Sequence, residues 1–181
     1  PSSMSTMQGR VGIVTAAGSG IGRASALAFA AAGASVVVSD IDDAAGEETV
    51  RQIVAGGGIA SFCHADVSIE DDVIALVAAT VERYGRLDWA HNNAAAGAPP
   101  APVTEQRRQR WDRVLGVTLT GTMLCLKHEI IQMQRQGMGG AIVNTSSIHS
   151  TAAFAGWAAY DTAKGGIDAL KPLFGRVAKA Y

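Results

Sequence analysis

The chain has 181 residues, of which 48% are hydrophobic and 17% charged, so it can bury one sizeable core and is short for two domains. Its formal charge is -1, from 15 basic and 16 acidic residues, a balance that predicts neither a nucleic acid nor a membrane as partner. No apolar run approaches the roughly 20 residues of a membrane span. Cys63 and Cys125 match no metal-ligand spacing, and free thiols are typical of a reducing compartment, so we predict a cytoplasmic protein.

Hydrophobic runs alternate with helical patterns along the chain, which is typical of a parallel sheet with crossover helices. We predict strands at 11–15, 36–39, 59–63, 87–91 and 141–146, and helices at 22–32, 43–55, 69–84, around 115–126 and from about 160 onward. The predicted fold class is α/β, a doubly wound parallel sheet with helices on both faces. Residues 1–8 are expected to be a disordered start or a cloning remnant.

A glycine-rich segment, residues 15–22, joins the first predicted strand to the first helix. Such turns let backbone amides at a helix N-terminus approach a pyrophosphate, which makes Ser19, Gly20 and Ile21 candidate cofactor contacts. The spacing Gly-x-Gly-x-x-Gly fails, because Arg23 stands where the third glycine is needed. A turn that merely lets strand and helix pack together explains the segment equally well.

Asp40 closes the second predicted strand, where a carboxylate can accept hydrogen bonds from the hydroxyls of an adenosine ribose. The same charge would repel a 2′-phosphate, so this residue favours NAD over NADP. The alternative is a solvated carboxylate at a strand end, as Asp42 and Asp43 illustrate nearby.

Tyr160 and Lys164 stand four residues apart in the last predicted helix, so their side chains share one face. Moving a phenol from its ordinary pKa of about 10 to neutrality takes about 4 kcal/mol of preference for the phenolate, which a neighbouring ammonium supplies. Ser147 lies thirteen residues before Tyr160, at the end of the fifth predicted strand. Its hydroxyl is a candidate to bind a substrate oxygen, with the adjacent Ser146 as the alternative.

Five segments in this order resemble the motifs of the short-chain dehydrogenase/reductase family and together cover about residues 10–164. They are the glycine loop at 15–22, the pair Asp66-Val67, the run 91–95, the strand and serine at 140–147, and the pair Tyr160 and Lys164. The resemblance implies a Rossmann-type fold, with residues 9–181 as a single NAD-binding domain. It also implies reversible hydride transfer between NAD and an alcohol or ketone substrate, no metal, and a homo-oligomer, either a dimer or a tetramer.

The resemblance implies roles for individual residues. Tyr160 would exchange a proton with the substrate oxygen, Lys164 would favour the phenolate and hold the nicotinamide ribose, and Ser147 would fix the oxygen. The cofactor would also contact Asp66, Val67, Asn93 and Ala95. His149 and Trp157, between Ser147 and Tyr160, are expected to line the substrate pocket.

Three residues depart from the family pattern. Ala16 and Ala95 stand where glycines are usual, and Thr118 stands where an asparagine anchors a water. The chain ends at Tyr181, which makes it C-terminally short relative to the family and would leave one sheet edge unpaired. Pro172 predicts that the last helix kinks or ends near residue 171. These departures motivate a second hypothesis, a non-catalytic or impaired dinucleotide-binding protein on the same fold.

Overall fold

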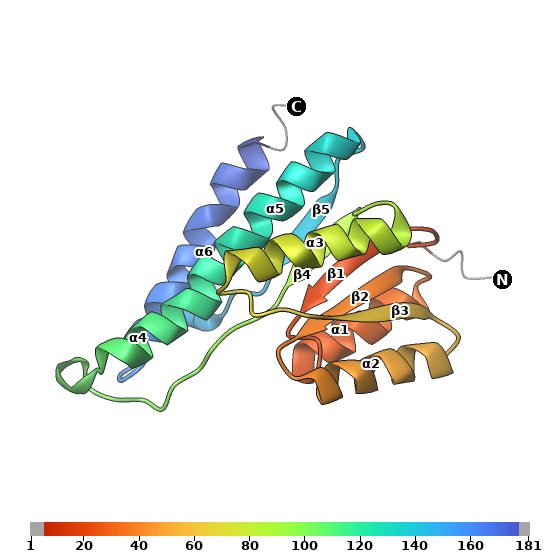
Figure 1. Ribbon diagram of the computed structural model, residues 1–181. Coiled ribbons are helices and arrows are strands. Elements are labelled where there is room, and N and C mark those ends of the chain that lie inside the picture. The colour runs from red at the N-terminus through yellow and green to blue at the C-terminus, as the bar shows by residue number, and fades with distance from the viewer. Residues whose placement is uncertain (1–5, 178–181) are drawn as a thin grey trace.

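The centre of the protein is a sheet of five parallel strands in the order β3-β2-β1-β4-β5 (Figure 1). The computed structural model describes residues 6–177, with side chains through residue 170. The strands are β1 (Val11–Thr15), β2 (Ser35–Asp40), β3 (Ile59–His64), β4 (Trp89–Asn92) and β5 (Ala141–Asn144). Strand order reverses between β1 and β4, so the predicted doubly wound sheet is confirmed.

Helices cover both faces of this sheet (Figure 1). One face carries α1 (Gly20–Ala31) and α2 (Asp43–Ala55). The helices on the side of the opposite face are α3 (Glu70–Tyr84), α4 (Arg108–Leu115), α5 (Gly121–Gln136) and α6 (Ala158–Val177). A π-helical turn, η2 (Gly116–Thr120), joins α4 to α5, and the 3-10 turns η1 (Val103–Glu105) and η3 (Ile148–Ser150) lie in the connections. α6 packs against α4, η2 and η3, which brings the last helix to the end of β5.

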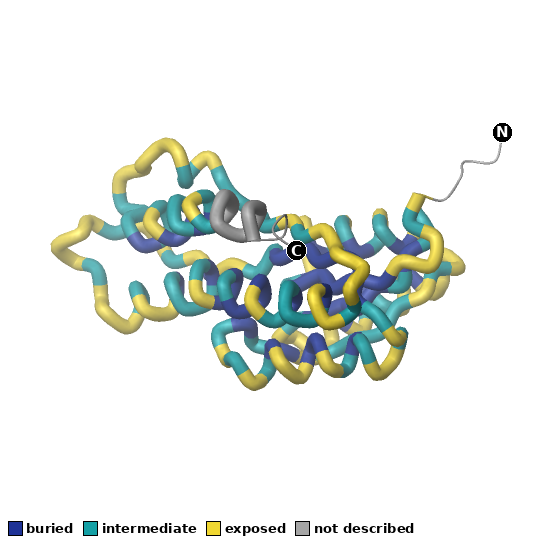
Figure 2. Tube along the Cα trace, turned by 90° about the horizontal axis from the view of Figure 1, so that it is seen from above, coloured by how far each residue is buried: buried dark blue, intermediate teal, exposed yellow. Residues whose placement is uncertain are grey.

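Alternate residues of the strands point to opposite faces and build two separate cores. Val36 and Val38 of β2 pack with Ala26 of α1, whereas Val37 packs with Leu76 of α3. Figure 2 shows the buried residues gathered along the sheet and the helix faces turned toward it. Helices thus cover most of both faces, although Val143 of β5 remains 56% exposed, and in such a sheet ligands bind at the carboxyl ends of the strands.

The helical stretch Arg108–Gln136 is long and apolar enough to cross a membrane by length and composition alone, which corrects the expectation that no segment approaches that length. Its most apolar window is 44% buried within the protein, and α5 packs against α3 and β4. The stretch also carries buried polar side chains, Thr118, Thr122 and Glu129. In this structure it is a packed element of the fold.

Some predicted element ends are wrong. Of the two alternatives for the last helix, a kink or an end near residue 171, the end is wrong, because α6 continues to Val177. An internal proline removes one backbone donor, and a helix can absorb that loss as a bend. β4 begins two residues later than predicted, at Trp89, and just before it the Asp88 side chain accepts the amide of Val11 at 2.9 Å. β5 ends at Asn144, and among the described strands it pairs with β4 alone.

Candidate active site

The glycine loop presents an exposed helix N-terminus beside the point where strand order reverses. Gly20 has a φ of 51°, which glycine adopts without strain, and a Cβ on Gly22 would lie 2.1 Å from the carbonyl oxygen of Ala16. Ser19, Gly20 and Ile21 are all exposed, and Ile21 is 66% exposed. The first amides of α1 have no acceptor within the helix, so the loop forms a cradle for an anion.

Ala16 has a left-handed backbone conformation. Its φ is 49°, the one positive value at a non-glycine residue in the described chain. A left-handed conformation costs an alanine about 1–2 kcal/mol. Asn93 helps to hold it, because Nδ2 of Asn93 donates to the carbonyl oxygens of Thr15 at 3.4 Å and Ala16 at 3.5 Å. The departure from glycine therefore leaves the turn itself in place.

Asp40 is bound to the glycine loop rather than left in solvent. Its Oδ2 accepts a hydrogen bond from the amide of Gly18 at 2.8 Å, and its Oδ1 accepts one from the amide of Asp42 at 3.0 Å. A Cβ on Gly18 would lie 2.7 Å from Oδ2, so this close approach requires glycine. The carboxylate and the anion cradle thus belong to one site.

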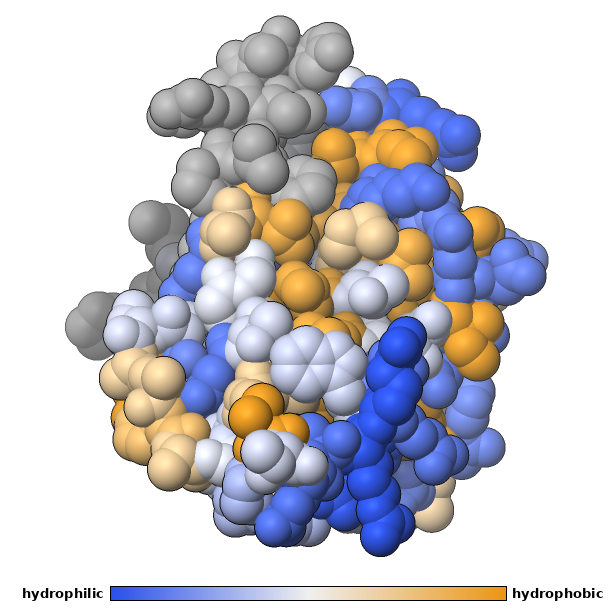
Figure 3. All heavy atoms as spheres, turned by 90° about the vertical axis from the view of Figure 1, so that its left-hand side faces the viewer, coloured by the Kyte–Doolittle hydropathy of each residue, from blue (hydrophilic) through white to orange (hydrophobic). Residues whose placement is uncertain are grey.

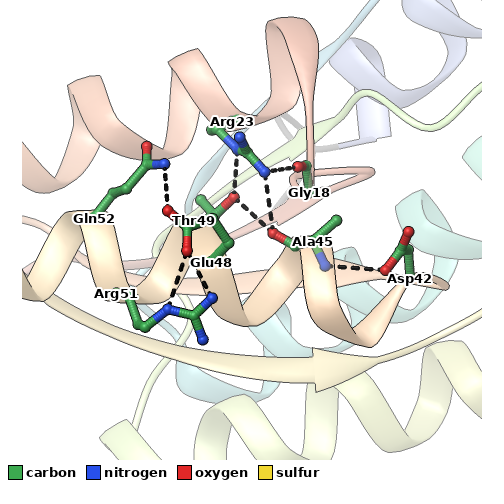
Figure 4. Close-up of polar contacts among 8 residues, drawn as sticks. All are labelled: Gly18, Arg23, Asp42, Ala45, Glu48, Thr49, Arg51 and Gln52. Carbon is green, nitrogen blue, oxygen red and sulfur yellow. Dashed lines mark hydrogen bonds and ion pairs between the residues drawn. The ribbon is translucent and has the colours of Figure 1, made fainter.

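Arg23 fastens the cradle to α2, as Figure 4 shows. Its guanidinium donates to the carbonyl oxygen of Gly18, to that of Ala45 at 3.3 Å, and to Oγ1 of Thr49 at 2.9 Å. Thr49 in turn donates to the carbonyl oxygen of Ala17 at 2.8 Å. From the sequence, Arg23 was only the residue that broke a glycine motif; the partners it finds on α2 are too far along the chain for a spacing rule to indicate them.

Thr145, which sequence reasoning missed, links the ends of β4 and β5. Its hydroxyl donates to Oδ1 of Asn93 at 3.1 Å and lies 2.8 Å from Nε2 of His91. Nδ1 of His91 lies 2.7 Å from the hydroxyl of Ser25, and burial lowers the pKa of His91. These contacts fit a neutral His91 that donates from Nε2. Asn93 is thereby fixed between the glycine loop and the end of β5.

Asp66 and Val67 lie near the cofactor edge but are occupied by local contacts. Oδ1 of Asp66 accepts from the amide of Ser68 at 2.9 Å and from its hydroxyl at 2.6 Å, and Val67 is buried in a small core. A backbone hydrogen bond connects this segment to the residue beside the cradle, because the amide of Ala65 donates to the carbonyl oxygen of Asp40 at 3.3 Å. No described contact joins the side chains of Asp66 and Val67 to the glycine loop.

The departures at Ala95 and Thr118 meet at the end of β4. Ala95 is exposed, and the next amide, that of Ala96, donates to Oγ1 of Thr118 at 3.0 Å. Thr118 is 0% exposed, and its carbonyl oxygen accepts from the hydroxyl of Thr122 at 2.8 Å. The Thr118 hydroxyl therefore supports the loop after β4 instead of facing open solvent.

Lys164 and Tyr160 come together on α6 as the four-residue spacing predicts. Nζ of Lys164 donates to the carbonyl oxygen of Thr145 at 2.6 Å and lies 5.6 Å from the centre of the Tyr160 ring. Lys164 is 1% exposed, and burial lowers its pKa, an effect that the charge of Asp168 opposes. A buried cation thus stands beside a half-buried phenol.

Ser147 reaches the same region from the end of β5. Its Oγ accepts a hydrogen bond from the amide of His149 at 3.2 Å and so caps η3. That bond leaves the hydroxyl proton of Ser147 available for donation. The Oγ of Ser146 is buried and has no partner among the described residues, so Ser147 is the serine with a defined local role.

Tyr160 also borders a small pocket between α6 and the loop that follows β4. The lining includes Ala98, Pro99, Gln106 and Trp157. Figure 3 looks at the end of the molecule where α4 begins, and it shows apolar and strongly hydrophilic side chains side by side on that face.

Among the described residues, no group of three or more His, Cys, Asp or Glu side chains is placed to hold a metal ion.

Comparisons with known proteins agree on one family. A family model described as short chain dehydrogenase matches residues 10–176. A short chain dehydrogenase/reductase of Aspergillus oryzae is 45% identical over 166 residues, 91% of this chain and 64% of that protein. A 2,5-dichloro-2,5-cyclohexadiene-1,4-diol dehydrogenase of Sphingobium indicum is 44% identical over 145 residues, 80% of this chain and 57% of that protein. The crystal structure of a short chain dehydrogenase/reductase from Burkholderia phymatum in complex with NAD has a TM-score of 0.92 at 30% identity, covering 97% of this chain and 62% of that one.

The chain spans less than two thirds of the length of each of these three proteins. The match to the family model nonetheless runs from just before β1 to the end of α6, and so includes every element described above. The order of the strands, the glycine loop and this match show that the chain belongs to the short-chain dehydrogenase/reductase family of oxidoreductases.

Proposed function

We propose that the protein is an NAD-dependent oxidoreductase that moves a hydride between the cofactor and the carbon of an alcohol or ketone group. The observation that carries this proposal is the placement of Lys164, a buried cation held by the Thr145 carbonyl at 2.6 Å and facing the Tyr160 ring. Burying a charge is unfavourable unless it has partners, and this one stands where a phenolate would be stabilised.

The residues at the switch point fit a dinucleotide. The exposed N-terminus of α1, at Ser19, Gly20 and Ile21, offers amides to a pyrophosphate, and Asp40 lies next to it as an acceptor for ribose hydroxyls. A 2′-phosphate there would meet a like charge, which supports NAD over NADP. When bound, NAD accepts the hydride, and its reduced form supplies it.

The chain's own residues would handle the proton and the oxygen. Tyr160 would give its phenolic proton to the substrate oxygen, or take one from it, because the charge of Lys164 favours the phenolate. Ser147 would donate its free hydroxyl proton to the same oxygen and hold the substrate in place. Lys164 would also hold the nicotinamide ribose, Asp66 and Val67 would contact the adenine, and Asn93 and Ala95 would border the cofactor. In this proposal residues 9–181 act as one cofactor-binding unit.

A small cyclic alcohol or ketone is the substrate class that we favour. The relative from Sphingobium indicum is named as the dehydrogenase of a ring diol. Trp157 and Ala98, which line a small hollow beside Tyr160, would give such a ring apolar neighbours.

A dinucleotide-binding protein without turnover is the second candidate. One observation favours it: the hydroxyl of Thr118 is engaged with the backbone of Ala96, at 3.0 Å, where family members place an asparagine that anchors a water. A missing proton relay would impair the chemistry and leave the cofactor cradle unchanged.

A turnover measurement distinguishes the oxidoreductase from the dinucleotide-binding protein. The protein would be incubated with NAD and a panel of cyclic and acyclic secondary alcohols while the absorbance of the reduced cofactor is followed, and NAD affinity would be measured by calorimetry. We expect NAD binding and turnover of at least one cyclic alcohol. Binding without any turnover would favour the second candidate, and the absence of both would contradict both.

A further inference from the structure

A histidine–aspartate pair lies beside the proposed catalytic residues and has no part in the chemistry above. Nδ1 of His149, in η3, lies 2.5 Å from Oδ1 of Asp161, in α6. The other oxygen of Asp161, Oδ2, accepts the amide of Phe154 at 2.8 Å. The two paired side chains are 19% and 13% exposed. The pair thus ties the turn after Ser147 to the helix that carries Tyr160.

The imidazole stands next to the groups proposed to hold the substrate oxygen. Its ring centre lies 5.2 Å from that of Tyr160, 5.4 Å from that of Trp157 and 4.3 Å from that of Phe154. The amide of His149 itself donates to Oγ of Ser147. A substrate oriented by Tyr160 and Ser147 would therefore lie near this ring, between aromatic walls that suit a carbon skeleton.

Asp161 determines which ring nitrogen carries the proton. A carboxylate only accepts hydrogen bonds, so in the neutral ring Nδ1 carries the hydrogen and Nε2 presents a lone pair. Among the described residues, none is hydrogen-bonded to Nε2 of His149. The ring contacts Asp161 through Nδ1, and the bond to Ser147 comes from the backbone amide. A partly buried acceptor without a protein partner, next to a substrate site, is available to a donor on the substrate.

We infer that Nε2 of His149 accepts a hydrogen bond from a second hydroxyl group of the substrate, so that the protein selects diols, and the matching hydroxyketones, over simple alcohols. This inference rests on the proposed function, because it places the reacting oxygen at Tyr160 and Ser147. His149 is then a specificity residue that touches substrate, and Asp161 is a positioning residue that keeps the lone pair on Nε2. An ether, a ketone or a carboxylate at the second position offers no donor to this lone pair.

The test compares matched substrates. For the protein and four variants, kcat/KM would be measured with cyclohexanol and with the isomers of cyclohexanediol. We expect the protein to prefer at least one diol. His149→Leu, which keeps bulk and removes the acceptor, should lower kcat/KM for that diol about tenfold or more while cyclohexanol stays within about threefold. His149→Gln, which retains an acceptor oxygen, should recover part of the preference.

Asp161→Asn and an exposed control separate the acceptor role from a structural one. The asparagine keeps an acceptor for the Phe154 amide but no longer fixes the tautomer, so the diol preference should fall. Thr151→Ala removes only an exposed hydroxyl that donates to the carbonyl oxygen of Ile148 in η3 at 3.2 Å, so kcat/KM for both substrates should stay unchanged. If His149→Leu lowered kcat/KM equally for both substrates, or for neither, the inference would be overturned.

Failure of the proposed function gives a different result. If no alcohol is turned over, calorimetry with NAD-loaded protein can still measure how tightly the diol and cyclohexanol bind. Weaker binding of the diol, but not of cyclohexanol, to His149→Leu would support the role of His149 even so. Equal binding of the diol to both proteins would contradict it.

Discussion

Nζ of Lys164 donates a 2.6 Å hydrogen bond to the carbonyl oxygen of Thr145, which ties α6 to the chain just after β5. The backbone thereby fixes the cation beside Tyr160. Lys164→Met removes the charge while keeping much of the length, so turnover should fall roughly 10²-fold or more, because an acid–base catalyst loses its support. Steady-state kinetics and calorimetric titration of NAD check this, and NAD binding should weaken as well.

Lys127→Met is the matched control for that substitution. Lys127 lies on α5, half exposed, and its ammonium pairs with Glu70 at 2.7 Å, far along the chain from the site. Activity should stay within about twofold of the original, since exposed ion pairs contribute little. Equal losses in both variants would show that the effect of Lys164→Met is not specific to the site.

Asp40→Ala tests the choice of cofactor. The carboxylate now accepts the Gly18 amide at 2.8 Å and is placed to repel a 2′-phosphate. We expect the protein to bind NAD at least about tenfold more tightly than NADP, a difference of about 1.4 kcal/mol, and the variant to lose most of that gap. Asp43→Ala, at an exposed carboxylate three residues later, should keep the ratio unchanged. If the ratio of NAD to NADP affinity is the same in the protein and in Asp40→Ala, Asp40 does not determine the choice of cofactor.

Arg23→Ala tests the support of the anion cradle. The substitution leaves the carbonyl oxygens of Gly18 and Ala45 and the hydroxyl of Thr49 without their guanidinium donor. Loss of such a donor typically costs about 1–3 kcal/mol, so we expect lower thermal stability and weaker NAD binding. Arg51→Ala removes a guanidinium from the same helix pair, but its partner Glu48 lies on the same helix, and NAD affinity should not change (Figure 4).

Glu129 should make stability depend on pH. It is 1% exposed, and burial raises its pKa from 4.5 to about 7, against the opposing hydrogen bond from Nδ2 of Asn92 at 2.9 Å. Because the folded pKa is the higher one, the unfolded chain releases this proton first as pH rises. The contribution is therefore full below pH 4.5 and is lost between pH 4.5 and about 7, on the order of 3 kcal/mol in all.

Glu129→Gln removes the titration and keeps an oxygen that can accept from Asn92. The free energy of unfolding, from urea denaturation at several pH values, should fall less steeply with rising pH in the variant than in the original protein. The gap between the two curves should open across the window given above and stay constant at higher pH. Parallel curves would show that Glu129 has the same pKa in the folded and unfolded protein, and so would contradict this prediction.

Local patterns in the sequence were sufficient to predict much of the fold. β1 and α2 have the predicted limits, 11–15 and 43–55. For α2 the reason is local, because Asp42 precedes the helix and its carboxylate accepts the amide of Ala45 at 3.0 Å. Lys164 and Tyr160 share a helix face for the same kind of reason, since helical spacing alone determines it.

Contacts between distant elements were beyond such rules. Arg23 meets Thr49, and His149 meets Asp161, across 26 and 12 residues, and no periodicity links partners on separate elements. The positive φ of Ala16 could not be predicted from local patterns either, because the side chain that holds this turn, Asn93, lies at the end of another strand. The sequence also left open whether α6 kinks or ends near residue 171, since a proline indicates a weak point in a helix without determining whether the helix ends there.

Comparison of the protein with Tyr160→Phe tests the central claim most directly. The substitution removes the transferable proton and leaves the ring that lies beside His149 and Lys164. With NAD and the best cyclic alcohol, production of reduced cofactor should fall by roughly 10²–10⁴-fold, while calorimetry should find NAD affinity within about threefold of the original. Turnover by Tyr160→Phe at the original rate would contradict the assignment of Tyr160 as the acid–base residue and, with it, the proposed mechanism.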